Sequence, residues 1–169
     1  MKSQTPKEVI NQWFERVWNS RDKGAIPLLM TDDAVAHLAG GVQVSGTAEF
    51  SGFHNMLLGA FPDLSVRILG SVGDDTQACL HWELHGTHKG EFSVIAPTHK
   101  SVCFNGMSFV TVRDGKIAEA LLETVVVSVD GEVHHWASKT DTSYDTEKSI
   151  YKPSDSRASC GTMESLRLR

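Results

Sequence analysis

Apolar residues near the amino terminus recur at the spacing of an amphipathic helix. Thr5, Pro6 and Glu8 precede them and supply a capping box with a proline at the first helical position. The pattern predicts a helix that ends near Asn19 and Ser20. The apolar stripe consists of Val9, Ile10, Trp13, Phe14, Val17 and Trp18.

Two further segments are expected to be helical. The residues from Lys23 to Met30 predict a short helix, which Gly24 weakens. The residues from Thr47 to Phe61 predict a longer helix that Pro62 ends. Its apolar face carries Phe50, Phe53, His54, Leu57, Leu58 and Phe61.

After Pro62 the hydrophobic period changes to two residues, which is typical of strands. Asp114-Gly115 marks a hairpin between the last two long strands. Helices followed by a run of antiparallel strands predict an α+β fold. The predicted strands are 35–38, 42–44, 64–69, 77–88, 102–112 and 117–129, with a short one near Val133 and Trp136.

The carboxyl-terminal part of the chain differs in composition from the rest. Residues 138–169 contain seven serines and four threonines and few periodic apolar residues. Such a segment buries too little surface to offset its ordering entropy. We therefore expect one domain over residues 1–137 and a tail over 138–169 that is disordered or loosely docked.

Composition excludes several classes of protein. The chain has 169 residues and a formal net charge of −5, which argues against a nucleic-acid partner. No apolar run reaches the 18 to 20 residues of a membrane span, and no apolar stretch follows the charged amino terminus. Three widely spaced cysteines favour a reducing compartment and unreactive thiols at Cys79 and Cys103. We expect a cytoplasmic protein.

Histidines and carboxylates on one strand invite a metal interpretation. His81, Glu83 and His85 alternate, so they share a face. A structural metal site would need closed fourfold ligation, which this pattern does not supply. We interpret the face as a polar surface, exposed or covered by a second copy, and expect no metal. Nucleotide-binding and standard hydrolase motifs are also absent from the sequence.

The last long strand carries two carboxylates among apolar residues. Glu119 and Glu123 share a face with Ile117 and Leu121. If that face points inward, burial would raise the pKa of Glu123 toward values useful for proton transfer. If it points outward, both glutamates are solvated, and the pattern favours neither alternative.

Several segments resemble SnoaL-like ester cyclases, in order and with matching spacing from about Glu8 to Val127. They are FHNMLLGAFPDL at 53–64, Trp82, GTHKGEF at 86–92, IAPTHK at 95–100 and DGKIAE at 114–119. The resemblance implies the nuclear-transport-factor-two-like superfamily. Its fold is a cone in which a strongly curved antiparallel sheet wraps around N-terminal helices and holds a pocket in its mouth.

The resemblance also implies a function. Such proteins are commonly homodimers through the outer sheet face. Polyketide cyclases among them close a ring by intramolecular aldol condensation without metal or cofactor, and an acidic side chain in the pocket serves as general acid and base. This chain departs from the pattern, because Leu121 and Val125 stand where a Trp and the catalytic Asp are usual.

On that basis we expect a cofactor-independent cyclase or isomerase for an apolar, carbonyl-containing small molecule. Glu123 is the expected base and His88 the expected donor to the enolate oxygen, with His54 as a second candidate. A structural hydrogen bond would explain either histidine equally well. The alternatives are a non-catalytic binding protein, or a dehydratase or hydrolase on the same scaffold. The expected substrate-binding residues are Trp13, Phe14, Phe50, His54, Trp82 and Glu119.

Overall fold

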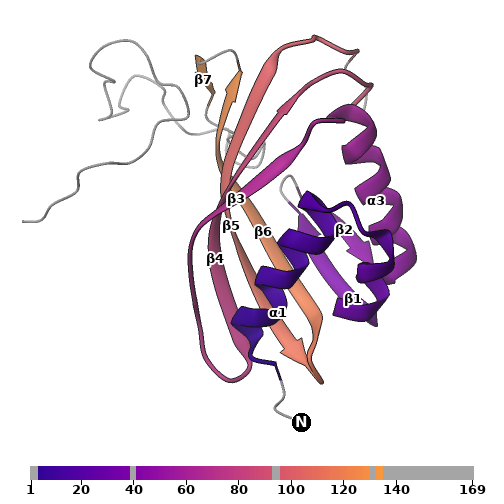
Figure 1. Ribbon diagram of the computed structural model, residues 1–169, viewed down its shortest axis with the longest axis vertical. Helices are drawn as coiled ribbons and strands as arrows, with labels where there is room; N and C mark the ends of the chain where they lie inside the picture. Colours follow the sequence, from indigo (N-terminus) through magenta and orange to yellow (C-terminus); the bar gives the residue numbers. More distant parts are fainter. Residues whose placement is uncertain (1–3, 39–40, 93–95, 130–131, 135–169) are drawn as a thin grey trace, which may run out of the picture.

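The computed structural model describes residues 4–38, 41–92, 96–129 and 132–134 of the chain (Figure 1). Side chains are described as far as Glu123. The tail of residues 138–169 and Trp136 lie outside the described residues, so the expectations for them stay predictions. Among the described residues, no helix is long and apolar enough to cross a membrane.

The first predicted helix is confirmed, but its second half is wound differently. Helix α1 spans Pro6–Trp13, and a π-helix, η1, continues it over Phe14–Asn19. The capping box is present: the Glu8 amide donates to Thr5 Oγ1 at 3.3 Å, and the Thr5 amide donates to Glu8 Oε2 at 2.8 Å. All six residues of the predicted apolar stripe are buried.

The other helices are close to their predicted positions. A 3-10 turn, η2, over Lys23–Ala25 leads into α2 at Ile26–Leu29, and α3 spans Gly46–Ala60. The first of these segments ends one residue before the predicted boundary, because Met30 already belongs to a strand.

The strands form one mixed, open sheet. Its order is β2-β1-β6-β5-β4-β3, and β7 pairs with β6 off this path. Strands β1 and β6 run parallel, whereas the remaining pairs are antiparallel. The expectation of a wholly antiparallel sheet is therefore corrected at this one pairing. The strands are β1 Met30–Leu38, β2 Val42–Ser45, β3 Ser65–Gly73, β4 Gln77–Thr87, β5 Ser101–Arg113, β6 Lys116–Val129 and β7 Glu132–His134.

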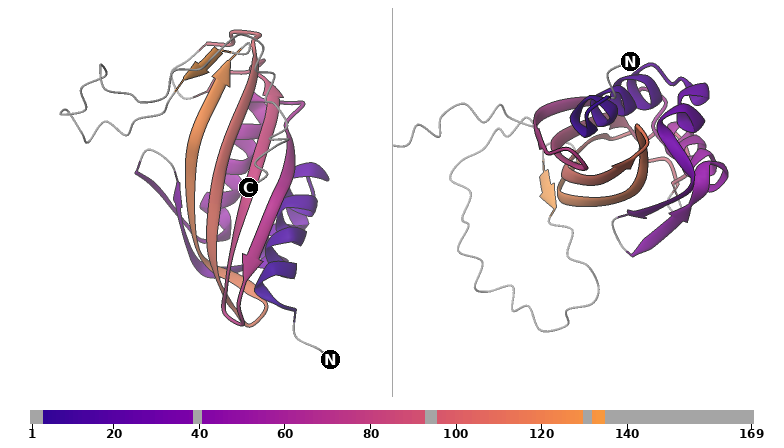
Figure 2. Two further views of the ribbon diagram at one scale, coloured as in Figure 1. Left: turned by 90° about the vertical axis from the view of Figure 1, so that its left-hand side faces the viewer. Right: turned by 90° about the horizontal axis from the view of Figure 1, so that it is seen from below.

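The long strands curve around α1, which lies on the concave side of the sheet, and α3 flanks β1 and β2 (Figure 2). The Asn19 side chain fixes the helical segment to strand β3. Its amide nitrogen donates to the Val66 carbonyl at 3.0 Å, and its oxygen accepts from the Val66 amide at 2.8 Å. The expected cone of curved sheet around helices is confirmed.

A bulge at the start of β6 decides which side chains point inward. Val112 pairs with Ile117, and Thr111 pairs with Glu119, so Ala118 is an extra residue in β6. Because side chains alternate along a strand, this extra residue inverts the facing of the residues that follow it, as far as the next register shift beyond Thr124. Ala120 and Leu122 therefore lie on the concave side, while Glu119, Leu121 and Glu123 are exposed.

Candidate functional site

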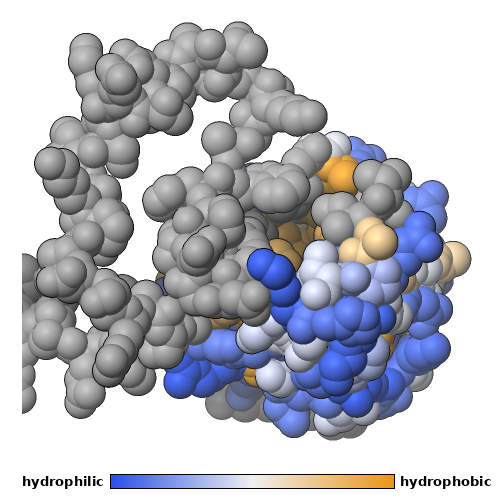
Figure 3. All heavy atoms as spheres, turned by 90° about the horizontal axis from the view of Figure 1, so that it is seen from above, coloured by the Kyte–Doolittle hydropathy of each residue, from blue (hydrophilic) through white to orange (hydrophobic). Residues whose placement is uncertain are grey.

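A cavity of about 530 Å³ lies between the concave face of the sheet and the helices. Such a volume falls within the range of small-molecule sites. Val42 and Met56 contribute to its wall and are themselves exposed, so they lie at its opening. In the space-filling view from above, apolar surface is visible between hydrophilic side chains (Figure 3).

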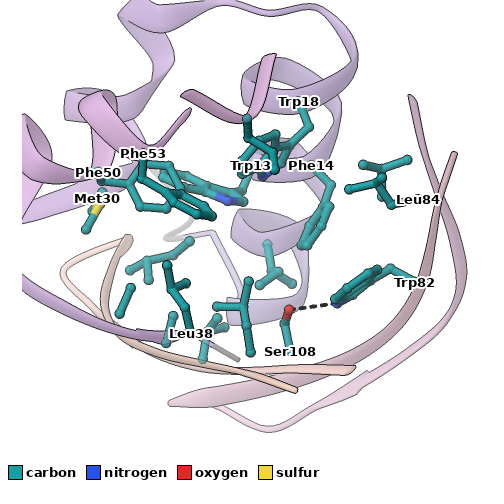
Figure 4. Close-up of a pocket in the computed structure, with 18 of the residues that line it drawn as sticks. Trp13, Phe14, Trp18, Met30, Leu38, Phe50, Phe53, Trp82, Leu84 and Ser108 are labelled. Atoms are coloured by element: carbon teal, nitrogen blue, oxygen red, sulfur yellow. Dashed lines mark hydrogen bonds between the residues drawn. The ribbon is translucent and has the colours of Figure 1, made fainter. Parts of the chain in front are cut away.

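The wall of the cavity comes from nearly every element of the described fold. Four of the expected substrate-binding residues, Trp13, Phe14, Phe50 and Trp82, contribute to it. Trp13 packs on Phe50 with ring centroids 4.9 Å apart. Other large side chains in the wall are Trp18, Met30, Leu38, Phe53 and Leu84 (Figure 4). Ile10, Leu57, Phe92, Phe104 and Leu122 also contribute.

Among the described residues of the wall there is a single hydroxyl group, that of Ser108 on β5. No Asp, Glu, His, Lys or Arg is found among the described residues that line the cavity. The Trp82 indole Nε1–H donates to Ser108 Oγ at 2.8 Å, and both residues are buried (Figure 4). The cavity therefore favours a largely apolar ligand.

Gly106 lets the Trp82 indole lie against strand β5. The two residues are paired across the strands, and a Cβ on Gly106 would come within 2.7 and 2.8 Å of two indole carbons. It would also collide with the Glu123 carbonyl oxygen. Any other side chain at position 106 would have to displace the indole from its place in the cavity wall.

His54 lies behind the wall rather than in it. It is fully buried, its Nε2–H donates to the Val17 carbonyl oxygen at 2.8 Å, and its ring centroid is 4.9 Å from that of Trp18. Burial lowers the pKa of His54, so the ring is neutral near pH 7. The prediction that His54 contacts the substrate is wrong, because Trp18 lines the cavity and His54 does not.

His88 is also buried and also outside the described wall. The Thr98 amide donates to its Nδ1 at 3.3 Å, which places the proton of the neutral ring on Nε2. In the part of the chain that the structure describes, that Nε2 has no hydrogen-bond partner. The His88 ring packs on Phe61, which in turn contacts the wall residues Phe92 and Phe104.

The two glutamates lie on the outer face of the sheet. Glu123 is exposed and pairs across the strands with the exposed Met107. Glu119 is exposed and its carboxylate lies 3.6 Å from His37 Nε2. The expected positions of Glu123 and Glu119 inside the pocket are therefore corrected, and the bulge at Ala118 is the physical reason.

The outer face of β4 carries a polar cluster. The buried Glu83 carboxylate accepts from Arg67 at 3.0 Å and from His85 at 2.7 Å, and His81 bonds Asn105 at 2.7 Å. The ligand atoms of Glu83, His85 and Cys103 lie within 4.8 Å of one another. Ion pairing already engages the carboxylate, and Cys103 is disulfide-bonded, so this cluster does not offer three free ligands.

The cysteines differ from expectation at one position. Cys79 is a free thiol, as expected, but Cys103 is disulfide-bonded, so the expectation of an unreactive thiol there is wrong.

Comparisons with known proteins agree with this geometry. A family model described as SnoaL-like polyketide cyclase matches residues 8–122. A search of curated proteins gave no match. The solved structure named "putative SnoaL-like polyketide cyclase" from Jannaschia sp. CCS1 is 20% identical with a TM-score of 0.65, and the alignment covers 73% of this chain and 91% of that chain.

Two Streptomyces structures are similarly related. IdmH of Streptomyces antibioticus, named "putative polyketide cyclase", is 25% identical with a TM-score of 0.63, covering 72% of this chain and 92% of that one. AclR of Streptomyces galilaeus, named "putative hydroxylase", is 24% identical with a TM-score of 0.61, covering 70% and 74%. Proteins that share this fold are thus named for different reactions.

Proposed function

The chain belongs to the SnoaL-like polyketide cyclase family, and from that premise we propose that it binds an apolar small molecule in the cavity inside its curved sheet. The observation that carries this proposal is the 530 Å³ cavity, whose described wall has one hydroxyl and no ionisable side chain. Burial of apolar ligand surface stabilises such a complex by about 25 cal/mol per Å² before the costs of association.

Tryptophan fluorescence offers a direct test, because Trp13, Trp18 and Trp82 all line the cavity. We expect 2-acetylnaphthalene, an apolar ketone, to quench this fluorescence saturably. Ala120→Phe places a large side chain in the cavity wall and should weaken binding at least tenfold. Ala48→Phe makes the same change at an exposed position of α3 and should leave the affinity unchanged. Equal affinities for the two variants would contradict the proposal.

A second candidate function is cofactor-independent cyclisation or isomerisation next to a carbonyl group. His88 favours it, because its buried Nε2–H has no partner among the described residues and a developing enolate oxygen could use it as donor. The ring lies one side chain behind the described wall, so a ligand would have to reach it past Phe61 and Phe92. For that reason binding, rather than catalysis, is the leading proposal.

Hydrogen exchange distinguishes the two candidates without knowledge of the natural substrate. The methyl hydrogens of 2-acetylnaphthalene exchange with deuterium oxide only through the enol or enolate. A cyclase or isomerase should accelerate this exchange, measured by proton nuclear magnetic resonance, and His88→Gln should abolish most of the acceleration. A binding protein should bind the ketone and leave its exchange at the buffer rate.

We also propose a homodimer that forms through the outer face of the sheet. Val72, Met107, Phe109 and Leu121 are apolar, lie on β3, β5 and β6, and are between 43 and 70% exposed. Phe109 and Leu121 are directly paired across the strands. An apolar sheet face of this kind favours burial against a second copy by a two-fold contact.

A further inference from the structure

We propose that the Ser108 hydroxyl is the donor that binds an acceptor oxygen of the ligand, and that Trp82 positions it. The inference rests on the proposed binding function and adds to it the chemistry of the ligand. The ligand is then an apolar molecule with a carbonyl or ether oxygen placed against the middle of strand β5.

The first step of the argument is the direction of the existing hydrogen bond. An indole nitrogen is only a donor, so the Ser108 oxygen must be the acceptor in its 2.8 Å contact with Trp82. The hydrogen of the serine hydroxyl is therefore not used in this bond. Among the described residues, no other hydrogen bond of this hydroxyl is found.

The second step concerns the surroundings of the Ser108 hydroxyl hydrogen. Ser108 is 2% exposed and pairs with Leu80 on one side and Leu122 on the other. The backbone of β5 is thus engaged in the ladder on both sides, and its side chains stand roughly perpendicular to the sheet. The hydroxyl lies in the cavity wall, with its oxygen on the cavity side of the strand (Figure 4).

The third step is the device that fixes the hydroxyl. Trp82 lies directly opposite Gly106, and the space left by the missing side chain accommodates the indole ring. Ser108 is two residues further along the same face, so the indole Nε1 reaches it diagonally across the strands. Gly106, Trp82 and Ser108 together hold one donor in place within an otherwise apolar wall.

A donor in such a wall discriminates between ligands of equal shape. A buried hydrogen bond that replaces an unsatisfied donor gives a preference of roughly tenfold. The test compares 2-acetylnaphthalene with 2-isopropenylnaphthalene, in which a methylene group replaces the carbonyl oxygen. Both dissociation constants are measured by tryptophan quenching for the wild-type protein and for Ser108→Ala.

We expect Ser108→Ala to weaken ketone binding roughly tenfold and to change alkene binding less than twofold. Ser108→Thr, which keeps the hydroxyl, should restore the preference for the ketone. The infrared stretching band of the bound carbonyl should move to higher frequency in Ser108→Ala, because the band is lowered by a hydrogen bond to its oxygen.

Trp82→Phe tests whether Trp82 positions the Ser108 hydroxyl. It removes the Nε1–H and leaves Ser108 in place, so the carbonyl band should broaden and the ketone preference should fall partway. The double variant Ser108→Ala/Trp82→Phe leaves no unsatisfied indole donor. It replaces Ser108→Ala in the binding measurements if the single variant does not fold.

The outcomes separate the inference from the proposed function. If neither compound binds the wild-type protein, the proposed function and the role of Ser108 both fail. If both bind, but Ser108→Ala alters neither their affinity ratio nor the carbonyl band, binding stands and the role of Ser108 is overturned. Equal losses for ketone and alkene in Ser108→Ala would also overturn it.

Discussion

His54 in α3 donates its Nε2–H to the carbonyl oxygen of Val17, 2.8 Å away in the π-helix η1. The bond joins two helical segments that are distant in the sequence, and it lies directly behind Trp18 in the cavity wall. π-helical turns leave the regular hydrogen-bond pattern and occur often at functional sites. Here one buried imidazole satisfies a carbonyl oxygen of such a turn.

Replacement of His54 by glutamine should change how stability depends on pH. Burial lowers the pKa of His54 in the folded protein below its usual value near 6.5. As the pH falls below 6.5, the unfolded chain takes up a proton that the folded chain does not, so the free energy of unfolding decreases by up to about 1.4 kcal/mol per pH unit. His54→Gln removes this contribution.

The measurement is urea denaturation of both proteins at pH 7.5, 6.5 and 5.5. The stability of the wild-type protein relative to His54→Gln should be greatest at pH 7.5 and should shrink toward pH 5.5. A difference that stays constant over this range would contradict the prediction.

Two glycine-to-alanine substitutions should have opposite effects. Gly106→Ala places a Cβ against the Glu123 carbonyl oxygen and the Trp82 ring and should destabilise the protein by about 1–3 kcal/mol. Gly52→Ala in α3 meets no atom within 4 Å and should stabilise it by about 0.5–1 kcal/mol. Thermal denaturation measures both, and a stable Gly106→Ala protein with unaltered Trp82 fluorescence would be inconsistent with the close packing described.

Glu123→Gln should be nearly silent. The carboxylate is exposed on the outer face, so its neutralisation should change stability by less than about 0.5 kcal/mol. Affinity for 2-acetylnaphthalene and the rate of its hydrogen exchange should also be unchanged. A loss of exchange activity without a loss of affinity would instead make Glu123 a base and contradict its placement.

The outer sheet face should determine the oligomeric state. We expect the wild-type chain to sediment as a dimer at micromolar concentration. Phe109→Lys introduces a charge into the apolar face and should produce monomers, because an unpaired charge is costly to bury. Leu28→Lys changes an exposed apolar residue of α2 and should leave the dimer intact. The mass of a single chain for the wild-type protein would rule out the proposed contact.

Local pattern predicted the helical part of this fold well. The stripe from Val9 to Trp18 is buried as expected, because a helical period of 3.6 residues is a strong signal over several turns. The parallel pairing of β1 with β6 was not foreseen. Its partners, such as Val35 and Glu119, are far apart in the sequence, and alternation along one strand carries no information about its neighbour.

The site was predicted only in part, for a similar reason. The aromatic wall residues Trp13 and Trp82 follow from periodicity, whereas the facing of Glu123 depends on the single extra residue Ala118. A bulge leaves little trace in composition, and this one reverses the facing of the residues from Glu119 to Glu123. Ser108 was overlooked because its significance comes from Trp82 on the adjacent strand.

The pairing of β1 with β6 also bears on how the chain folds. Strand β1 is synthesised about eighty residues before β6, the strand with which it pairs in parallel. The apolar side chains that β1 contributes to the cavity wall, such as Ala36 and Leu38, therefore lack this neighbouring strand until β6 has been synthesised. Closing so long a loop makes this contact intrinsically slow, so the apolar side chains of β1 stay exposed during that interval and favour aggregation.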